Sequence, residues 1–88
     1  MTERNTALIT GSGTGVGAAT ALLLAQKGWN VVVNYSRSEA DARATAQACR
    51  DAGADVLLLR GSVAEDADCK ALVQVTVDRW GRIDALVN

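Results

Sequence analysis

Short apolar runs alternate along the chain with longer segments in which apolar residues recur every three or four positions. The short runs are rich in Val, Ile and Leu, which predicts β-strands. Val31–Val33 is apolar without interruption, and this is typical of a strand that is covered on both faces, as in a parallel sheet. The four predicted strands cover residues 6–10, 31–33, 56–59 and 83–87.

The segments between these strands have helical patterns, at about 15–27, 38–53 and 65–80. Gly28 suits the position just after the first helix. Ser38–Asp41 approximates a capping box that would start the second helix. The residues that recur at helical spacing are Val16, Thr20, Leu23 and Leu24 in the first helix and Cys69, Leu72, Val73, Thr76, Val77 and Trp80 in the third.

Strand and helix alternate three times before the fourth strand, which predicts an α/β fold with a parallel sheet. In the nucleotide-binding arrangement the chain returns after strand three and lays strand four beside strand one, giving the order 3-2-1-4. That reversal opens a crevice at the carboxyl ends of strands one and four, where a glycine cluster at 11–17 would lie. The predicted fold class is therefore a partial Rossmann-type doubly wound parallel sheet.

The composition narrows the class of protein. The 88 residues carry nine Lys and Arg against ten Asp and Glu, so no basic surface indicates nucleic acid or an anionic membrane. No apolar stretch reaches the ~18 residues of a membrane span, and Met1–Arg4 does not suit a secretory signal. Histidine is absent, and Cys49 and Cys69 form no CxxC, so we expect no metal site and a cytoplasmic protein.

The glycine-rich segment Thr10–Gly17 lies between a predicted strand and a predicted helix, the context in which such a motif binds a nucleotide. Backbone N–H groups at a helix start, with the helix dipole behind them, bind a pyrophosphate without a basic side chain. Ser12 and Thr14 could add hydroxyl donors. Two spacings compete, Gly-x-Gly-x-x-Ala over 13–18 and Gly-x-x-x-Gly-x-Gly over 11–17.

A plain tight turn, whose glycines only allow the helix to pack on the strand, is the competing interpretation of this segment. The strand, the helix and four glycines in seven residues together favour nucleotide binding. No Gly-Lys-Ser/Thr follows, which disfavours a P-loop for nucleoside triphosphates.

The end of the second strand bears on the choice of cofactor. NAD sites commonly place an acid there to hold the ribose 2′-OH, but this strand continues as Asn34-Tyr35-Ser36-Arg37-Ser38. The acids Glu39 and Asp41 come later and fit the first turn of a helix. Arg37 could instead bind a 2′-phosphate, which predicts NADP(H) in preference to NAD(H), with a solvated surface arginine as the alternative.

With these motifs in place, the chain resembles the first part of a short-chain dehydrogenase/reductase. The cofactor turn of that family is Thr-Gly-x-x-x-Gly-x-Gly, and Thr10–Gly17 matches it at every position. The tail Trp80–Asn88 resembles the stretch that leads into the family's Asn-Asn-Ala-Gly motif, with Asn88 as its first Asn. The resemblance covers nearly all of the chain and implies that residues 1–88 are the N-terminal part of a single dinucleotide-binding domain.

The resemblance also implies site residues. Ser36 and Arg37 would meet the adenosine ribose or its 2′-phosphate, Ser62 and Val63 would flank the adenine, and Asn88 would lie near the cofactor at the end of strand four. Many members that prefer NADP carry Arg or Lys at the Thr14 position, whereas members that prefer NAD carry an acid at the Tyr35 position. The residues expected around the pyrophosphate and ribose are Gly11, Ser12, Gly13, Thr14, Gly15, Val16 and Gly17.

The family's catalytic Ser and Tyr-x-x-x-Lys lie beyond the position of Asn88, and Tyr35 is followed four residues later by Glu39. We therefore expect no catalytic residue in this chain, which would supply the cofactor-binding half of an enzyme. That enzyme would pass a hydride between NADP(H) and a small-molecule carbonyl or alcohol. Its expected partners are the remainder of its own protein and, as a dimer or tetramer, copies of itself.

Two further interpretations stay open from the sequence. A nucleotide-binding module or regulator without catalysis fits the same turn, and another Rossmann-type enzyme such as a methyltransferase fits the turn but not the tail. Trp29 and Trp80 are interpreted as packing residues. Cys49 and Cys69 fall within helices, where nothing marks them as nucleophiles. Asp84 is expected to have a structural role at the start of strand four.

Overall fold

The computed structural model describes residues 3–88 as a strict alternation of strands and helices. Every predicted element is present, and its bounds lie close to the predicted ones. The elements are β1 (Thr6–Ile9), α1 (Gly15–Gln26), β2 (Asn30–Tyr35), α2 (Glu39–Asp51), β3 (Val56–Arg60), α3 (Asp66–Trp80) and β4 (Ala85–Val87).

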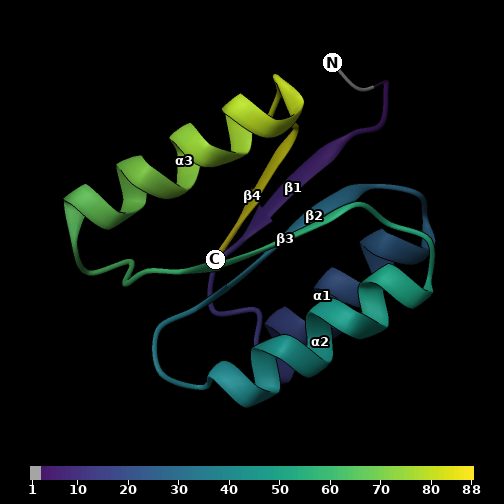
Figure 1. The fold of residues 1–88 in the computed structure, drawn as a ribbon, viewed down its shortest axis with the longest axis horizontal. Coiled ribbons are helices and arrows are strands. Elements are labelled where there is room, and N and C mark those ends of the chain that lie inside the picture. The colour runs from purple at the N-terminus through teal and green to yellow at the C-terminus, as the bar shows by residue number, and fades with distance from the viewer. Residues whose placement is uncertain (1–2) are drawn as a thin grey trace.

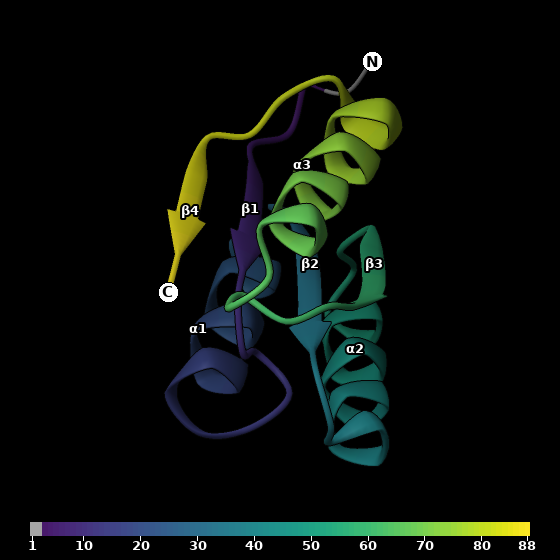
Figure 2. The same cartoon turned by 90° about the vertical axis from the view of Figure 1, so that its left-hand side faces the viewer.

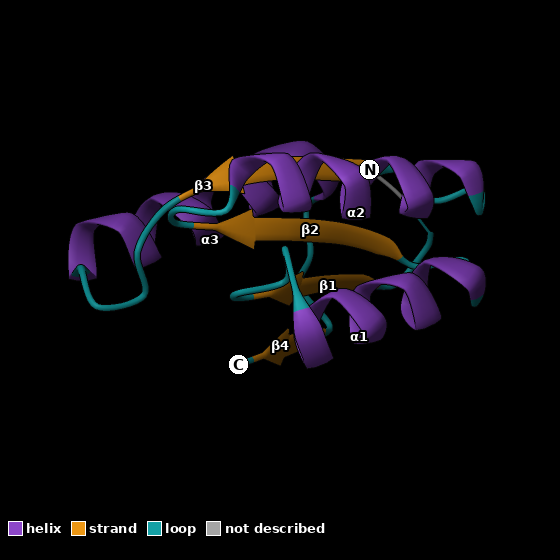
Figure 3. Cartoon of the chain, turned by 90° about the horizontal axis from the view of Figure 1, so that it is seen from below, coloured by secondary structure: helices purple, strands orange, loops and turns teal. Residues whose placement is uncertain are grey.

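The four strands form one parallel sheet in the order β3-β2-β1-β4, which confirms the predicted α/β fold and strand order. Figure 2 shows β4 and β3 at the two edges, and in Figure 3 all four arrows point the same way. β1 lies in the middle and pairs Ile9 with both Val33 and Val87. The carboxyl ends of β1, β2 and β4 therefore meet at one edge of the sheet.

The helices lie in two layers on opposite faces of the sheet, with α1 and α2 together on one side and α3 on the other (Figure 1). Alternate residues of each strand serve the two layers. Ile9 and Val33 pack with the alanines of α1 and α2, whereas Leu8 and Val32 pack with Leu72 and Trp80 of α3. Both faces of the central strands are therefore covered, as the apolar run in β2 predicted.

Of the apolar residues that recur at helical spacing in α1, Leu24 packs against the core, but Val16 and Leu23 do not. Val16 is 84% exposed and Leu23 is 53% exposed, whereas Ala21 and Ala25 are buried. The helix contains hardly any polar side chain, so apolar spacing alone does not select one face. Small alanines face inward because they let α1 approach the sheet and α2 closely.

Two helix ends can be compared with their predictions. The N–H of Gly28 donates to the carbonyl of Ala25, and that of Trp29 donates to Leu24, which is the predicted glycine cap on α1. Trp29 also packs against the core, as expected. The prediction of a capping box at the start of α2 is wrong, because the side chain of Ser38 makes no capping hydrogen bond.

The start of the sheet is held by two carboxylates. Asp55 accepts a hydrogen bond of 2.8 Å from the buried indole of Trp80 and one of 2.9 Å from Arg79, which confirms Trp80 as a packing residue. Asp84 accepts from the backbone N–H of Thr6 at 2.7 Å and from Arg82 through both of its oxygens. Asp84 therefore ties the start of β4 to the start of β1, the structural role expected for it.

Acid is expected to weaken the fold through Asp84. The Arg82 guanidinium and the Thr6 amide hold the pKa of Asp84 below its ordinary value of 3.8. A carboxyl whose pKa is lower in the folded chain stabilises the fold above its unfolded value and loses that contribution as the pH falls through the folded value. We expect the Tm of the full-length protein to fall as the pH drops below about 4, and to fall less in Asp84→Asn.

The control for this prediction is Asp51→Asn, since Asp51 is an exposed carboxylate at the end of α2 that accepts one bond from Gln47. This variant should keep the acid sensitivity of the wild type. An acid-induced fall in Tm that is equally steep in Asp84→Asn would contradict the assignment.

Within residues 3–88, no helix has both the length and the apolar character needed to cross a membrane, and no group of side chains could hold a metal ion. Cys49 is fully buried, and burial raises the pKa of its thiol, which disfavours the reactive thiolate. The Cys69 thiol donates to the carbonyl of Val63.

Candidate functional site

The glycine-rich turn lies where the strand order reverses, as the sequence predicted. It follows β1, whose end is held against the end of β4 by the N–H of Thr10, which donates to the carbonyl of Val87 at 2.9 Å. The Thr10 hydroxyl also lies 3.1 Å from Oδ1 of Asn88. The turn and Asn88 therefore lie together at the carboxyl ends of β1 and β4.

The first amides of this turn are engaged inside the protein. Gly11 N–H donates to Oδ1 of Asn34 at 3.1 Å, and Ser12 N–H donates to the Asn34 carbonyl at 2.9 Å. The Ser12 hydroxyl, expected as a donor to a ligand, is buried, donates to the Ile9 carbonyl and accepts from Asn34 N–H. Thr10, Gly11 and Ser12 therefore shape the turn, and their N–H groups are not free for a ligand.

The next four amides differ. The N–H groups from Gly13 to Val16 have no hydrogen-bond partner within residues 3–88, and Thr14, Gly15 and Val16 are exposed. Thr14 makes no side-chain cap, and the first turn of α1 contains no acid. Free N–H groups at the positive end of a 12-residue helix make an anion-binding site.

Close backbone packing holds this turn in place. A Cβ added to Gly17 would lie 2.6 Å from the carbonyl oxygen of Gly11, closer than real side chains come to a backbone atom. A Cβ on Gly13 would lie 3.3 Å from Cβ of Ala42 on α2, and the hydroxyl of Thr45 donates to the Gly13 carbonyl. The start of α1 is therefore fitted against both the end of β1 and α2.

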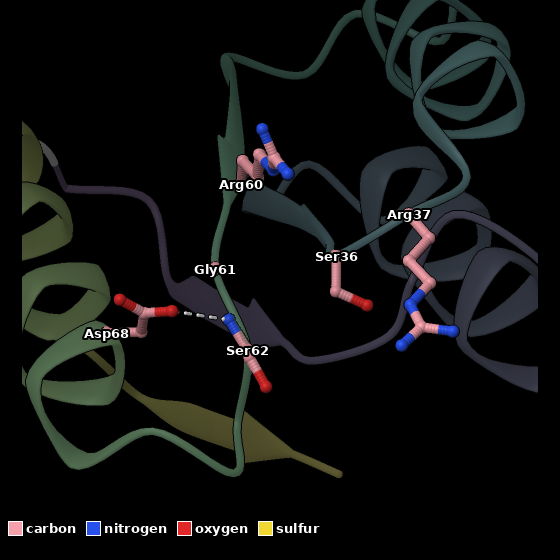
Figure 4. Close-up of a pocket in the computed structure, with 6 residues that line it drawn as sticks. All are labelled: Ser36, Arg37, Arg60, Gly61, Ser62 and Asp68. Atoms are coloured by element: carbon pink, nitrogen blue, oxygen red, sulfur yellow. Dashed lines mark hydrogen bonds between the residues drawn. The ribbon is translucent and has the colours of Figure 1, made fainter.

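Two neighbouring hollows open beside the turn. The smaller has a volume of about 270 Å³ and the larger about 830 Å³, and both are lined by Ser36 and Arg37. Figure 4 shows Ser36 and Arg37 on one side of the larger hollow and Ser62 and Asp68 on the other. The remaining lining residues are Gly11, Gly13, Thr14, Asn34, Tyr35 and Ser38 in the smaller hollow and Arg60 and Gly61 in the larger.

The charges around the hollows favour an anion. Arg37 and Arg60 make no ion pair with any residue from 3 to 88. Glu39 is bonded by Arg43 at 2.7 Å, and this bond lowers the pKa of the Glu39 carboxyl. Asp68 accepts from the backbone N–H of Ser62 at 2.9 Å. Neither guanidinium group is therefore paired with a carboxylate within residues 3–88, so both could bind an anionic ligand. The nearby carboxylates of Glu39 and Asp68 each already accept a hydrogen bond.

The site residues predicted from the sequence all lie at the carboxyl ends of the strands or in the segments that directly follow them. Val63 follows Ser62 outside the larger hollow and is exposed. Glu39 and Asp41 occupy the first turn of α2, as expected.

The site residues predicted from the sequence leave out six residues that line the hollows, namely Asn34, Tyr35, Ser38, Arg60, Gly61 and Asp68. A signal existed for Asn34, because it is a polar residue directly after three valines at the carboxyl end of a strand. Asp68 gave no such signal, since acids in the first turn of a helix are common.

Known proteins resemble this chain in both sequence and fold. The family described as short chain dehydrogenase matches residues 5–88. The short-chain dehydrogenase/reductase homolog YusS of Bacillus subtilis is 39% identical over 82 residues, which are 93% of this chain and 75% of that protein. The 3-oxoacyl-(acyl-carrier-protein) reductase FabG of Staphylococcus aureus is 36% identical over 88 residues, which are 100% of this chain and 36% of that protein.

Among solved structures, the NADH-dependent reductase A1-R' complexed with NAD matches with a TM-score of 0.86 and 38% sequence identity. The match covers 97% of this chain and 35% of that one. The chain thus spans about a third of the length of most of the curated relatives and solved structures that it matches.

Proposed function

The chain belongs to the short-chain dehydrogenase family, and on that premise we propose that the protein is an NADP(H)-dependent oxidoreductase acting on a small-molecule carbonyl or alcohol. The nicotinamide would supply or accept the hydride, while the residues of this chain bind and orient the cofactor. The names of the relatives, a reductase of 3-oxoacyl groups and an acetoin dehydrogenase among them, favour an enzyme over a non-catalytic nucleotide-binding module.

One observation carries the proposal. The free amides from Gly13 to Val16 lie at the start of α1, beside the reversal of strand order, where open α/β sheets bind their ligands. A pyrophosphate would accept hydrogen bonds from these amides and would be stabilised by the helix dipole. Gly17 supports this fit, since its missing side chain leaves room for the turn to close beneath the ligand.

The other residues would hold the remainder of the dinucleotide. In this proposal Gly11 and Ser12 shape the turn, Ser36 and Arg37 meet the ribose and its 2′-phosphate, and Ser62 and Val63 flank the adenine. Asn88, beside Thr10, would lie near the nicotinamide half. The residues proposed to surround the cofactor are Gly11, Gly13, Thr14, Gly15, Val16, Gly17, Ser36, Arg37, Ser62, Val63 and Asn88, with the buried Ser12 supporting the turn from inside the protein.

The preference for NADP(H) rests on two features at the end of β2. Arg37 is exposed and has no ion-pair partner within residues 3–88. The end of β2 also carries no carboxylate that could accept from a ribose 2′-OH. The structural neighbour A1-R' is NADH-dependent, which supports a nicotinamide cofactor but not a preference for its 2′-phosphorylated form. The experiment must therefore test whether the 2′-phosphate contributes to binding.

The rest of the enzyme would come from outside these residues. We propose that residues 1–88 are the N-terminal part of one dinucleotide-binding domain and that the catalytic Ser, Tyr and Lys belong to the remainder of the protein. The whole would act in the cytoplasm as a homodimer or homotetramer.

The proposed activity can be tested directly. The full-length protein, given NADPH and a panel of ketones and aldehydes, is expected to consume the reduced nicotinamide only when a carbonyl compound is present. The blank without a carbonyl compound controls for slow cofactor decay. A protein that binds NADPH but oxidises it with no member of the panel, and reduces NADP with no alcohol, would favour a non-catalytic module instead.

A further inference from the structure

Asn34 is a polar side chain buried at the junction of three strands. It follows the three buried valines of β2 and is 2% exposed. A buried amide is costly unless its donors and its acceptor are all bonded, and each of them is bonded here. The side-chain oxygen accepts from Gly11, and the side-chain nitrogen lies 3.2 Å from the carbonyl oxygens of both Leu59 and Gly61.

The two ends of this amide hold different walls of the candidate site. Its oxygen accepts from Gly11, which begins the turn and lines the smaller hollow. Its nitrogen donates to the carbonyl of Gly61, which lines the larger hollow and whose own N–H donates to the Tyr35 carbonyl at 2.9 Å. The backbone of Asn34 adds two bonds to Ser12. The ladder between β1 and β2 ends at Ile9 and Val33, so beyond that point Asn34 provides the connection between the turn and β2.

From this juxtaposition we infer that Asn34 is a positioning residue. It sets the distance between the glycine-rich turn, where the pyrophosphate would bind, and the larger hollow, where the adenosine half would bind. This inference rests on the proposed function, because it assumes that one dinucleotide occupies both places. Asn34 is only 2% exposed, so in this role its amide acts through Gly11 and Gly61 and not through a contact of its own with the ligand. Its two-ended amide holds Gly11 and Gly61 in a fixed relation, so that both halves of the cofactor bind at once.

The physical consequence is a difference between whole and divided ligands. A ligand with two linked parts gains affinity only when both subsites lie at the spacing that the linker allows. If the spacing slips, each subsite keeps its own donors and still binds its fragment, whereas the linked ligand loses the advantage of the linkage. A general loss of folding would instead weaken fragments and whole ligand together.

The test uses Asn34→Asp in the full-length protein. The variant keeps the oxygen that accepts from Gly11 but turns a second oxygen toward the carbonyls of Leu59 and Gly61, which repel it. We expect the dissociation constant of NADPH to rise about tenfold and those of adenosine 2′-monophosphate and nicotinamide mononucleotide to rise less than about threefold. Calorimetry on each ligand measures these changes.

The pH adds a readout that a purely structural defect would not reproduce. A buried carboxyl beside two carbonyl oxygens has a raised pKa, and its protonated form can again donate to one of them. The ratio of NADPH to fragment affinity in Asn34→Asp should therefore lie closer to the wild-type ratio at about pH 6 than at about pH 8. Relative affinities that do not change with pH would overturn the inference.

Asn30 provides the matched control. It is an equally buried asparagine at the other end of β2, where its side chain donates to the hydroxyl of Thr6 at 3.1 Å. Asn30→Asp should lower the Tm while leaving the ratio of NADPH to fragment affinity within about twofold of the wild type. If Asn34→Asp does not fold, Asn34→Ser, which loses the double donor, undergoes the same comparison.

The outcomes separate the two claims. Equal weakening of NADPH and of both fragments in the Asn34 variant, with NADPH bound well by the wild type, overturns the positioning role alone. Wild-type protein that binds neither NADPH nor NADH overturns the proposed function and this inference with it.

Discussion

Gly17→Ala is expected to lower kcat/KM for NADPH on the order of a hundredfold, because the added methyl group moves the anion-binding end of α1. The Cβ would lie 2.6 Å from the Gly11 carbonyl oxygen and 2.9 Å from Cα of Ser12. Both atoms are backbone, so no side chain can rotate away and the helix or the turn must shift. A displacement of about 1 Å in a positioning element costs this much in rate.

The same substitution is expected to cost stability. Overpacking a well-filled site typically costs about 1–3 kcal/mol, and the better helix propensity of alanine offsets about 1 kcal/mol of that. Gly11 and Ser12 are in turn bonded to Asn34, so a shift of the turn would strain the buried contacts of Asn34 as well. Steady-state kinetics below the unfolding temperature, together with a melting curve, separate the two effects.

The control for Gly17→Ala lies at the other end of the same helix. Gly28 has a φ of 88°, and no neighbouring atom lies within 4 Å of the place that a Cβ would take, so Gly28→Ala strains only the backbone, by about 1–2 kcal/mol. Gly28→Ala should therefore lower the Tm and leave the KM for NADPH unchanged. A Gly17→Ala enzyme within about threefold of wild-type kcat/KM would mean that the turn does not hold the pyrophosphate.

The strand order was predictable because it depends on features that the sequence displays locally. Glycines separate short apolar strands from helical segments, and the motif context selects the arrangement in which β4 returns to β1. The buried face of α1 was not predictable in the same way. A helix made almost entirely of apolar residues has no polar face, and only contact with α2 and the sheet decides that Ala21 and Ala25 face inward.

In the candidate site, too, some residues could be predicted from local sequence and others could not. The glycine turn, Ser36 and Arg37 could be placed because each follows a predicted strand and parallel strands bring their carboxyl ends together. The hydroxyl of Ser12 was expected to reach a ligand, but it bonds Asn34, which lies 22 residues away in the sequence. Whether a polar group faces a ligand or the core depends on such distant contacts, which no local pattern encodes.

Removing the Arg37 side chain is expected to weaken NADPH binding by roughly tenfold to a hundredfold and to leave NADH binding unchanged. A hydrogen bond to a charged group contributes about 1.5–3 kcal/mol, which corresponds to that range. Arg37 lines both hollows beside Ser36 and has no ion-pair partner within residues 3–88, so no carboxylate competes with a 2′-phosphate for its guanidinium. Titration of Arg37→Ala with each reduced cofactor measures the change.

Arg43→Ala is the matched control, since it removes the same charge from the start of α2 but from a side chain already bound to Glu39 at 2.7 Å. It should leave the ratio of NADPH to NADH affinity as in the wild type. Because Arg37 is exposed, its contribution should also shrink as salt rises, screened over a Debye length of about 8 Å at physiological ionic strength. Tighter binding of NADH by the wild type, or equal losses for both cofactors in Arg37→Ala, would assign this arginine to the solvated surface.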